Sequence, residues 1–442
     1  MIDRGNGARA SKAVSVRVGR EALLRKALLG STALIGIALA TPALAQSTNP
    51  VGGGTISGTG SYTDVTGAGG GVQVTNTQNS GVTLSGVTIN NTTGDPTGIA
   101  YQQIAGNGQS AVLFTSGANA LSSNQNGAAI GMTAANGNLT WAIGQFDAAS
   151  TTDLTATYGA YLIATGFVNV VDFGTVTSLR SVTADGAGGA GIYASSSGSS
   201  VTLSLKAPVI SGFSTGIAAI SATGANVTTT GGSISTPASG TGISATASSA
   251  GGAVTVSSGS AISTSGAGIG INASSNNAAT SVTTTPGGTI NGGSVGIQVN
   301  AALTGQTSTV TVGAAIGNAT RPSSGVVFQG TGVVGGTNTA NANANISSGT
   351  GFAAIGSNTI NTDLAVNVAS GVSVTSQGSF AIRAGRDITL VNNGTVNATS
   401  GAGTGVSNSQ APSTLSVTNN GAMSAGKTVV DGQGTTNVTN AG

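Results

Sequence analysis

Apolar and polar residues alternate along most of this chain, in short segments separated by Gly, Ser, Thr and Asn. The clearest repeat lies between residues 254–273 and 282–301, where Val-Thr-Val, Ile-Ser-Thr and Gly-Ile-Gly-Ile-Asn-Ala return in the same order as Val-Thr-Thr, Ile-Asn-Gly and Gly-Ile-Gln-Val-Asn-Ala. Successive side chains of a strand point to opposite faces, so this alternation predicts β-strands with one apolar face. Three such strands in each repeat are typical of one triangular turn of a β-solenoid.

The Val-x-Val segment can be followed as a marker of each repeat. It falls near Val82, Val112, Leu139, Val168, Val201, Val227, Val254, Val282, Val310, Leu364, Ile388 and Leu415, with a weaker copy at 343–346. Most steps are about 26 to 31 residues long, within the range of structural repeats that stack into solenoids. The spacing predicts an all-β parallel β-helix of about thirteen coils over residues 71–442, with strands stacked about 4.8 Å apart.

The repeated sequence also predicts where the chain turns between two successive strands of a coil. Residues 391–396, Val-Asn-Asn-Gly-Thr-Val, match Thr-Asn-Asn-Gly-Ala-Met at 418–423. Asn and Gly tolerate a left-handed backbone, so we expect each Asn-Asn-Gly to form a left-handed corner between two strands.

Residues 1–45 form a different segment. Seven of the thirteen basic residues lie in the first 26 positions, an apolar run covers 27–40, and Ala43 and Ala45 occupy the −3 and −1 positions before Gln46. This pattern predicts a secretory signal peptide cleaved after Ala45. A membrane anchor is the alternative, but the run is shorter than the roughly 20 residues that a span needs. Residues 46–70 follow as a Gly/Ser/Thr-rich N-terminal segment.

Without residues 1–45 the chain carries six basic residues, nine Asp and no Glu, which gives a net charge of about −3. Nucleic-acid binding needs clustered Lys and Arg, so the sequence argues against a nucleic-acid partner. Cysteine is absent, which excludes disulfides and thiolate metal sites. We expect no cofactor and no metal. Disorder is disfavoured, because 38% of the residues are hydrophobic and they alternate.

Candidate catalytic residues are few. No His, Cys or Glu follows residue 45, so the usual general base and thiol nucleophile are missing, and we expect no enzyme. The separation of Asp153 and Asp185 is close to the local coil length, so we expect them to stack in adjacent coils. An oxygen-only cation site, however, usually needs more ligands than these two.

A second carboxylate pair tests the register. Asp363 precedes Leu364 as Asp387 precedes Ile388, so we expect the two carboxylates at one ladder position about 5 Å apart. Two Arg residues, at 383 and 386, are close enough in sequence to neutralise them. An exposed, screened charge cluster is the simpler interpretation, and a catalytic site is the alternative.

Residues 100–175 contain longer coils and most of the aromatic side chains. The eight aromatics are Tyr101, Phe114, Trp141, Phe146, Tyr158, Tyr161, Phe167 and Phe173. The favoured interpretation places them in ladders inside the coils. The alternative is a binding surface, because exposed Tyr and Trp are efficient contact residues.

The basic leader ending in Ala-Leu-Ala-Gln, together with coils such as Gly-Thr-Gly-Ile-Ser-Ala (240–245) and Gly-Ala-Gly-Ile-Gly-Ile (266–271), resembles the passenger domain of a Gram-negative autotransporter (type V secretion). The resemblance implies a right-handed β-helix, an outer-membrane β-barrel translocator as partner, and frequent service as an adhesin. It supplies no functional residue. The chain ends at residues 439–442 within a further repeat and lacks the amphipathic strands of a translocator. Either the sequence is a fragment without its barrel, which is the favoured interpretation, or the protein is exported by another route.

Three functions remain open. The leading one is an exported, non-catalytic surface rod for adhesion or cell–cell aggregation, which binds a host or neighbouring-cell surface, including its carbohydrate. The second is a structural spacer or self-associating surface layer. The third is a polysaccharide-active enzyme that uses Asp. The signal predicts export through the periplasm to the outer membrane, the cell surface or the medium.

Overall fold

The structure, a computed structural model, describes fourteen ranges of the chain. They are 54–57, 60–63, 66–68, 72–76, 80–91, 99–123, 127–175, 177–185, 188–249, 251–276, 278–301, 307–330, 336–358 and 362–441. The predicted signal peptide and its cleavage residues Ala43, Ala45 and Gln46 lie outside these ranges.

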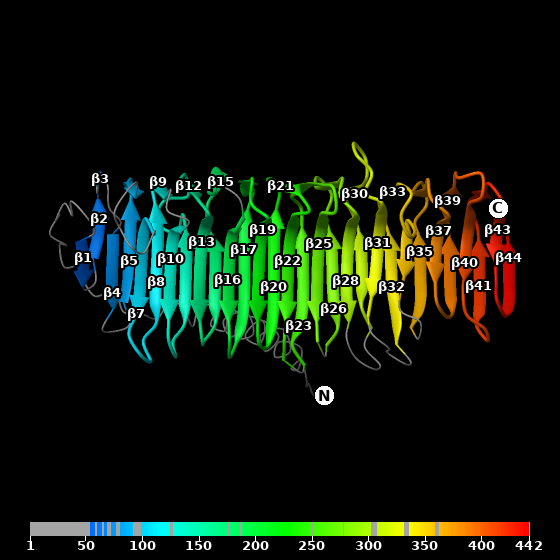
Figure 1. Ribbon diagram of the computed structural model, residues 1–442, viewed down its shortest axis with the longest axis horizontal. Coiled ribbons are helices and arrows are strands. Elements are labelled where there is room, and N and C mark those ends of the chain that lie inside the picture. Colours follow the sequence, from blue (N-terminus) through cyan, green and yellow to red (C-terminus); the bar gives the residue numbers. More distant parts are fainter. Residues whose placement is uncertain are drawn as a thin grey trace, which may run out of the picture. The chain divides into compact units, whose positions relative to one another are not determined.

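All regular elements of the described residues are strands, and they form three parallel sheets (Figure 1). Sheet A consists of β1 (Gly54–Ser57), β4 (Val72–Asn76), β7 (Tyr101–Ala105), β10 (Ala128–Ala134), β13 (Tyr158–Ala164), β16 (Ala190–Ser196), β19 (Thr215–Ser221), β22 (Thr241–Ala247), β25 (Ile269–Ser275), β28 (Val295–Ala301), β31 (Ser324–Gln329), β34 (Ile355–Ser357), β37 (Phe380–Ala384), β40 (Thr404–Asn408) and β43 (Thr428–Asp431).

Sheet B consists of β2 (Gly60–Thr63), β5 (Ser80–Ser85), β8 (Ala111–Ser116), β11 (Leu139–Ile143), β14 (Val168–Asp172), β17 (Ser200–Lys206), β20 (Gly224–Thr230), β23 (Ala253–Ser258), β26 (Thr280–Thr284), β29 (Thr309–Val312), β32 (Thr337–Ala342), β35 (Asp363–Val368), β38 (Ile388–Asn392), β41 (Thr414–Asn419) and β44 (Thr435–Asn440).

Sheet C consists of β3 (Thr66–Ala68), β6 (Thr88–Asn91), β9 (Ala118–Ser123), β12 (Thr151–Ala156), β15 (Ser181–Ala184), β18 (Val209–Ser211), β21 (Ser233–Ala238), β24 (Ala261–Ser265), β27 (Thr289–Asn291), β30 (Ala315–Ile316), β33 (Ile346–Ser348), β36 (Ser373–Ser376), β39 (Thr395–Ala398) and β42 (Ala422–Ala425).

Each complete coil contributes one strand to each sheet, and strands pair in parallel with the strand three numbers further on. This confirms the predicted parallel β-helix, and the predicted thirteen coils are close to the fifteen strands of sheet B. Twelve of the Val-x-Val markers lie in sheet B strands. The weak copy at 343–346 was misplaced, because the sheet B strand of that coil is β32 and Ile346 begins β33 in sheet C.

The core lies between the three sheets, where inward side chains form straight ladders. In sheet B one row is at most 1% exposed and consists of Leu203, Val227, Val256, Val282, Val310, Ala340, Val366, Leu390 and Val417. Thr, Ser and Asn occupy most of the alternate, outward positions. The period-two pattern of the sequence therefore encodes which face is buried.

A second ladder joins sheets A and C. A Cβ built on Gly242, near the start of β22, would lie 2.5 Å from the Ile262 Cγ2 atom and 2.5 Å from the Gly270 carbonyl oxygen. The same close packing against a β-branched residue of sheet C recurs at Gly159, Gly191, Gly216, Gly270, Gly296 and Gly325. In two later coils Ala354 and Ala381 take this position, and the sheet C residues there are Val374 and Val396. Gly therefore faces Ile in most of these coils and Ala faces Val in the two later ones, while Gly159 faces Val182.

The Asn-Asn-Gly corners form as predicted in position but for a different reason. Neither Gly394 nor Gly421 has the left-handed backbone that we expected. Gly394 is required by space, because an added Cβ would clash with the Val372 carbonyl oxygen. Asn392 is fully buried, accepts a hydrogen bond from the Gly394 N–H at 3.1 Å, and donates to Asn419 Oδ1 at 2.7 Å. The corner is therefore held by a buried Asn ladder.

Candidate binding face on sheet A

The outward side chains of sheet A form rows, because its parallel strands pair in register. One row runs through Gln102, Gly131, Tyr161, Tyr193, Ala218, Ser244, Asn272, Gln298, Val327, Gly356, Arg383 and Ser407. Three clusters along this row carry chemically distinct side chains: aromatic, amide and guanidinium. We call this surface the sheet A face.

The tyrosine cluster lies on β13 and β16. Tyr161 and Tyr193 stack across adjacent coils with ring centroids 4.9 Å apart and planes 17° apart, and Tyr158 meets Tyr161 edge-on at 5.0 Å. All three rings are half-buried. Their neighbours in the row, Gly131 and Ala218, are small. The rings therefore form an aromatic platform on the outer surface of the sheet.

Burial raises the pKa of Tyr161 above its ordinary value of 10.0, and the nearby phenols of Tyr193 and Tyr158 raise that pKa further. The cause is physical: a phenolate beside other phenols in a partly dry environment is poorly solvated. The Tyr161 hydroxyl consequently stays protonated at neutral pH and can donate or accept a hydrogen bond.

The amide cluster lies three strand steps further along, on β25 and β28. Asn300 Nδ2 donates to Asn272 Oδ1 at 2.9 Å, and Gln298 Nε2 donates to Asn300 Oδ1 at 3.4 Å. Each amide keeps further donor or acceptor capacity after these bonds. Because the strands are about 4.8 Å apart, roughly 14 Å separates β16 from β25.

The guanidinium cluster lies at β37, a further three steps beyond β28. The Arg383 guanidinium carbon is 4.4 Å from the Phe380 ring centroid and 5.0 Å from that of Phe352. These distances are typical of cation–π contacts, which hold the cation on the sheet surface. Arg383 therefore does not neutralise the aspartate pair to which the sequence assigned it.

Six of the eight aromatic side chains of residues 100–175 are not buried in the core, so the favoured interpretation of aromatic ladders inside the coils is wrong for those six. Only Tyr101 and Trp141 are buried among the eight. The Trp141 Nε1–H donates to Thr115 Oγ1 at 3.2 Å, which satisfies the indole inside the core. Phe146 and Phe173 are 56% and 43% exposed. Alternation alone cannot show the side on which an aromatic residue of a loop or longer coil will lie.

Asp363 and Asp387 occupy one ladder position, as predicted, because Leu364 pairs with Ile388. Arg386 Nε lies 3.6 Å from Asp363 Oδ1, and Asp387 Oδ1 accepts the Thr414 N–H at 2.6 Å. Burial raises the pKa of Asp363 most strongly and the Asp387 charge adds to this, while Arg386 lowers it. Both carboxylates thus have structural partners.

The expected stacking of Asp153 on Asp185 is wrong. Asp153 pairs with Ser181 in the ladder and forms an ion pair with Arg180. Asp185 follows Ala184, which pairs with Ala156, so it lies one position beyond the ladder. The local coil step, from Asp153 to Ser181, is shorter than the separation of the two aspartates in sequence, and the carboxylates therefore do not meet.

Within the described ranges, no group of three or more His, Cys, Asp or Glu side chains could hold a metal ion. No helix among these residues has the length and apolar character of a membrane span.

Comparison with family models, curated proteins and solved structures gives no match. The fold itself defines the class: the chain is a parallel β-solenoid protein with repeated coils.

Proposed function

We propose that this chain is the exported β-helix passenger of an autotransporter, and that it mediates adhesion or cell–cell aggregation by binding carbohydrate on host or neighbouring cells. Binding occurs on the sheet A face, without catalysis. The observation that carries the proposal is the stacked Tyr161–Tyr193 platform, which shares a row with Asn272 and Gln298.

A sugar residue has an apolar face of C–H groups and an edge of hydroxyls. The tyrosine rings offer flat apolar area, and the amides offer both donors and acceptors for hydroxyls. The coils stack along one axis (Figure 1). The three clusters of the sheet A face follow one another along that axis and would contact successive parts of an extended ligand. A linear or repeating saccharide is therefore the ligand class that the sheet A face suits best.

The partners of the aspartates support a non-catalytic role. Asp153 and Asp363 are paired with Arg180 and Arg386, and Asp387 accepts a backbone N–H. General acid–base hydrolysis of a glycosidic bond needs two carboxylates facing each other across a substrate. The Asp363 and Asp387 side chains are instead neighbours at one ladder position, with Arg386 Nε 3.6 Å from Asp363 Oδ1 and the Thr414 N–H bound to Asp387. The signal-like segment 1–45 supports export, and the cell surface or medium is the proposed destination.

The test is binding of the full chain to an oligosaccharide array and to cells, compared between wild type, Tyr161→Ala and Tyr193→Ala. Phe173→Ala is the matched control, because it removes an exposed ring that lies on the sheet B side. We expect each Tyr variant to lose about tenfold in affinity, equivalent to about 1.4 kcal/mol, and the control to bind normally. Equal binding by Tyr161→Ala and Phe173→Ala would remove the sheet A face from the proposal.

A further inference from the structure

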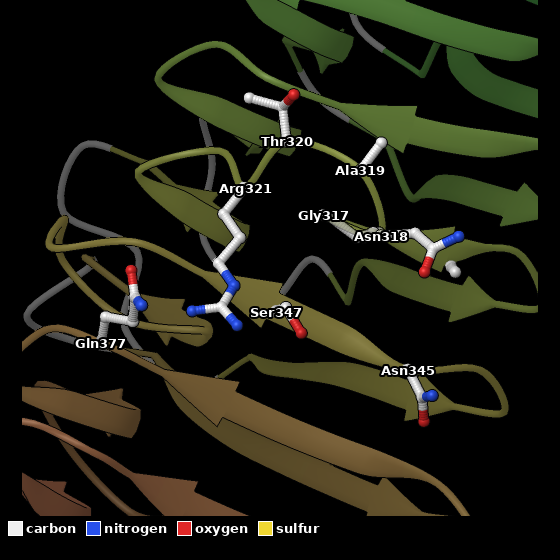
Figure 2. Close-up of a pocket in the computed structure, with 10 residues that line it drawn as sticks. Gly317, Asn318, Ala319, Thr320, Arg321, Asn345, Ser347 and Gln377 are labelled. Atoms are coloured by element: carbon white, nitrogen blue, oxygen red, sulfur yellow. The ribbon is translucent and has the colours of Figure 1, made fainter.

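A separate groove lies on the outer side of sheet C, about 610 Å³ in volume. Its floor comes from β30 and β33, and the segment 317–321 forms one wall (Figure 2). The polar side chains that line it are those of Asn318, Thr320, Arg321, Asn345, Ser347 and Gln377. Figure 2 shows the Arg321 side chain extending across the groove toward Ser347 and Gln377. No residue of the sheet A face takes part.

The wall and the two residues that follow it are held to the coils on both sides. The wall is bonded to the preceding coil through Gly317 N to Ile290 O (2.7 Å), Ala319 N to Asn291 Oδ1 (2.9 Å) and Gly292 N to Thr320 O (2.7 Å). Ser323 N donates to Gly293 O (3.0 Å) of that coil, and Gly349 N of the following coil donates to Pro322 O (2.8 Å). Pro322 further restricts the backbone of Arg321. The guanidinium is therefore carried by a fixed backbone, which reduces the ordering entropy lost on binding.

The charge of Arg321 is not compensated nearby. Its side chain is exposed, and the structure gives it no ion pair with any described carboxylate. The sequence contains no acidic residue at all between Asp185 and Asp363. One other cation lies in that stretch, Lys206, and its Nζ donates to the Gly174 carbonyl. The groove therefore carries a local positive potential, although the chain after residue 45 has a net negative charge.

The remaining lining is neutral and rich in hydrogen-bonding groups. Asn345 Oδ1 accepts the Ser373 N–H at 2.8 Å, which fixes the orientation of that amide. A guanidinium presents a planar fork of N–H donors that matches one carboxylate through two hydrogen bonds. Amides and hydroxyls around it suit sugar hydroxyls. A single cation also balances one carboxylate better than a phosphate dianion.

We propose that this groove binds the carboxylate of an acidic sugar residue, with Arg321 as its charged partner. The inference rests on the proposed function insofar as the ligand is a saccharide, but it concerns a second site on another sheet. A chain with both sites binds an acidic polysaccharide at two separate surfaces, which strengthens attachment when the ligand is polymeric.

The experiment measures binding of the full chain to immobilised polygalacturonate, polysialic acid and fully methyl-esterified polygalacturonate. The ester keeps the sugar backbone and removes the charge. Arg321→Gln is compared with Arg321→Lys and with Lys427→Gln, which removes the same unit of charge at an exposed residue outside the groove. Thermal unfolding checks that each variant is folded.

We expect Arg321→Gln to bind at least one of the acidic polymers about tenfold more weakly, a loss in keeping with one charged hydrogen-bonding pair. Lys427→Gln should change the affinity less than twofold, and Arg321→Lys should be intermediate, because it keeps the charge without the fork. The ester should bind wild type and Arg321→Gln equally. Galacturonic acid should compete more effectively than inorganic phosphate.

Three results would overturn the assignment: equal losses for Arg321→Gln and Lys427→Gln, binding of neither acidic polymer by wild type, or competition by phosphate as strong as by galacturonic acid. Failure of the sheet A proposal has a different signature. In that case Tyr161→Ala binds every polymer normally, while Arg321→Gln still loses only the acidic ones.

Discussion

The Gly–Ile ladder between sheets A and C allows a quantitative test of how each coil is packed. In Gly242→Ala the new methyl group would approach the Ile262 Cγ2 atom and the Gly270 carbonyl to 2.5 Å, closer than real Cβ contacts allow. Overpacking of this kind typically destabilises by about 1 to 3 kcal/mol. We therefore expect Gly242→Ala to lower the free energy of unfolding by about 2 kcal/mol.

The same geometry predicts a partial rescue. Ile262→Val removes one methyl group and alone should cost about 1 kcal/mol. In the double variant the valine can retreat into the vacated space, which reproduces the Ala354–Val374 combination of a later coil. We expect the double variant to be more stable than the sum of the single effects predicts, by at least about 0.5 kcal/mol.

Urea unfolding followed by circular dichroism gives the stabilities, and hydrogen exchange shows where protection is lost. Because each coil contacts only its neighbours, the loss in Gly242→Ala should be concentrated in β22, β24 and the adjoining coils. Gly401→Ala is the matched control, since nothing lies within 4 Å of its added Cβ and its φ is not positive. Additive single effects, or a Gly242→Ala as stable as the control, would refute the packing argument.

Three further predictions concern polar groups. Asn392→Ala should lower stability by about 1 to 3 kcal/mol in urea unfolding, because the Gly394 N–H and the buried Asn419 amide lose their partner; a neutral effect would contradict the buried ladder. The pKa of Asp363 is raised above 3.8 in the folded state, so the folded protein binds this proton more tightly than the unfolded chain does. The free energy of unfolding should therefore fall as pH rises from about 3.8 through the raised pKa. Asp363→Asn should flatten this decline in thermal melts at different pH values. Because burial raises the pKa of Tyr161 above 10.0, its phenol ionises at a higher pH than a free tyrosine, so Tyr161→Phe should remove absorbance change from the part of an ultraviolet titration above pH 10, and an unchanged curve there would disprove the assignment.

The sequence predicts this fold well because every coil of a solenoid repeats the same pattern of three strands. Each Val-x-Val segment is a weak strand signal alone, but its return at a nearly constant interval fixes the stacking, and the Asp363–Asp387 register follows from it. The prediction fails where the coil length changes. Asp153 and Asp185 are the clear case, because a few residues of loop shift a side chain out of the ladder.

The candidate sites were less predictable. Tyr161 and Tyr193 align only because sheet A pairs them, and the longer local coils hid that register in the sequence. Arg321 gave no signal of its own, since one basic residue before a proline in a loop matches no motif. The proposed role of Arg321 rests on a fixed backbone, a groove and the lack of nearby acidic residues, and only the last of these is visible in the sequence.

Because the strands of sheet A stack in register, the distance between two side-chain clusters on its face is a whole number of strand spacings. Adding or deleting one complete coil keeps every ladder intact and moves the tyrosine, amide and guanidinium clusters relative to one another in increments of about 4.8 Å. Duplication or loss of a coil-length stretch of coding sequence thus changes the spacing of these clusters without disturbing the core, so under the proposed function a change in repeat number is a direct way to acquire a new binding specificity.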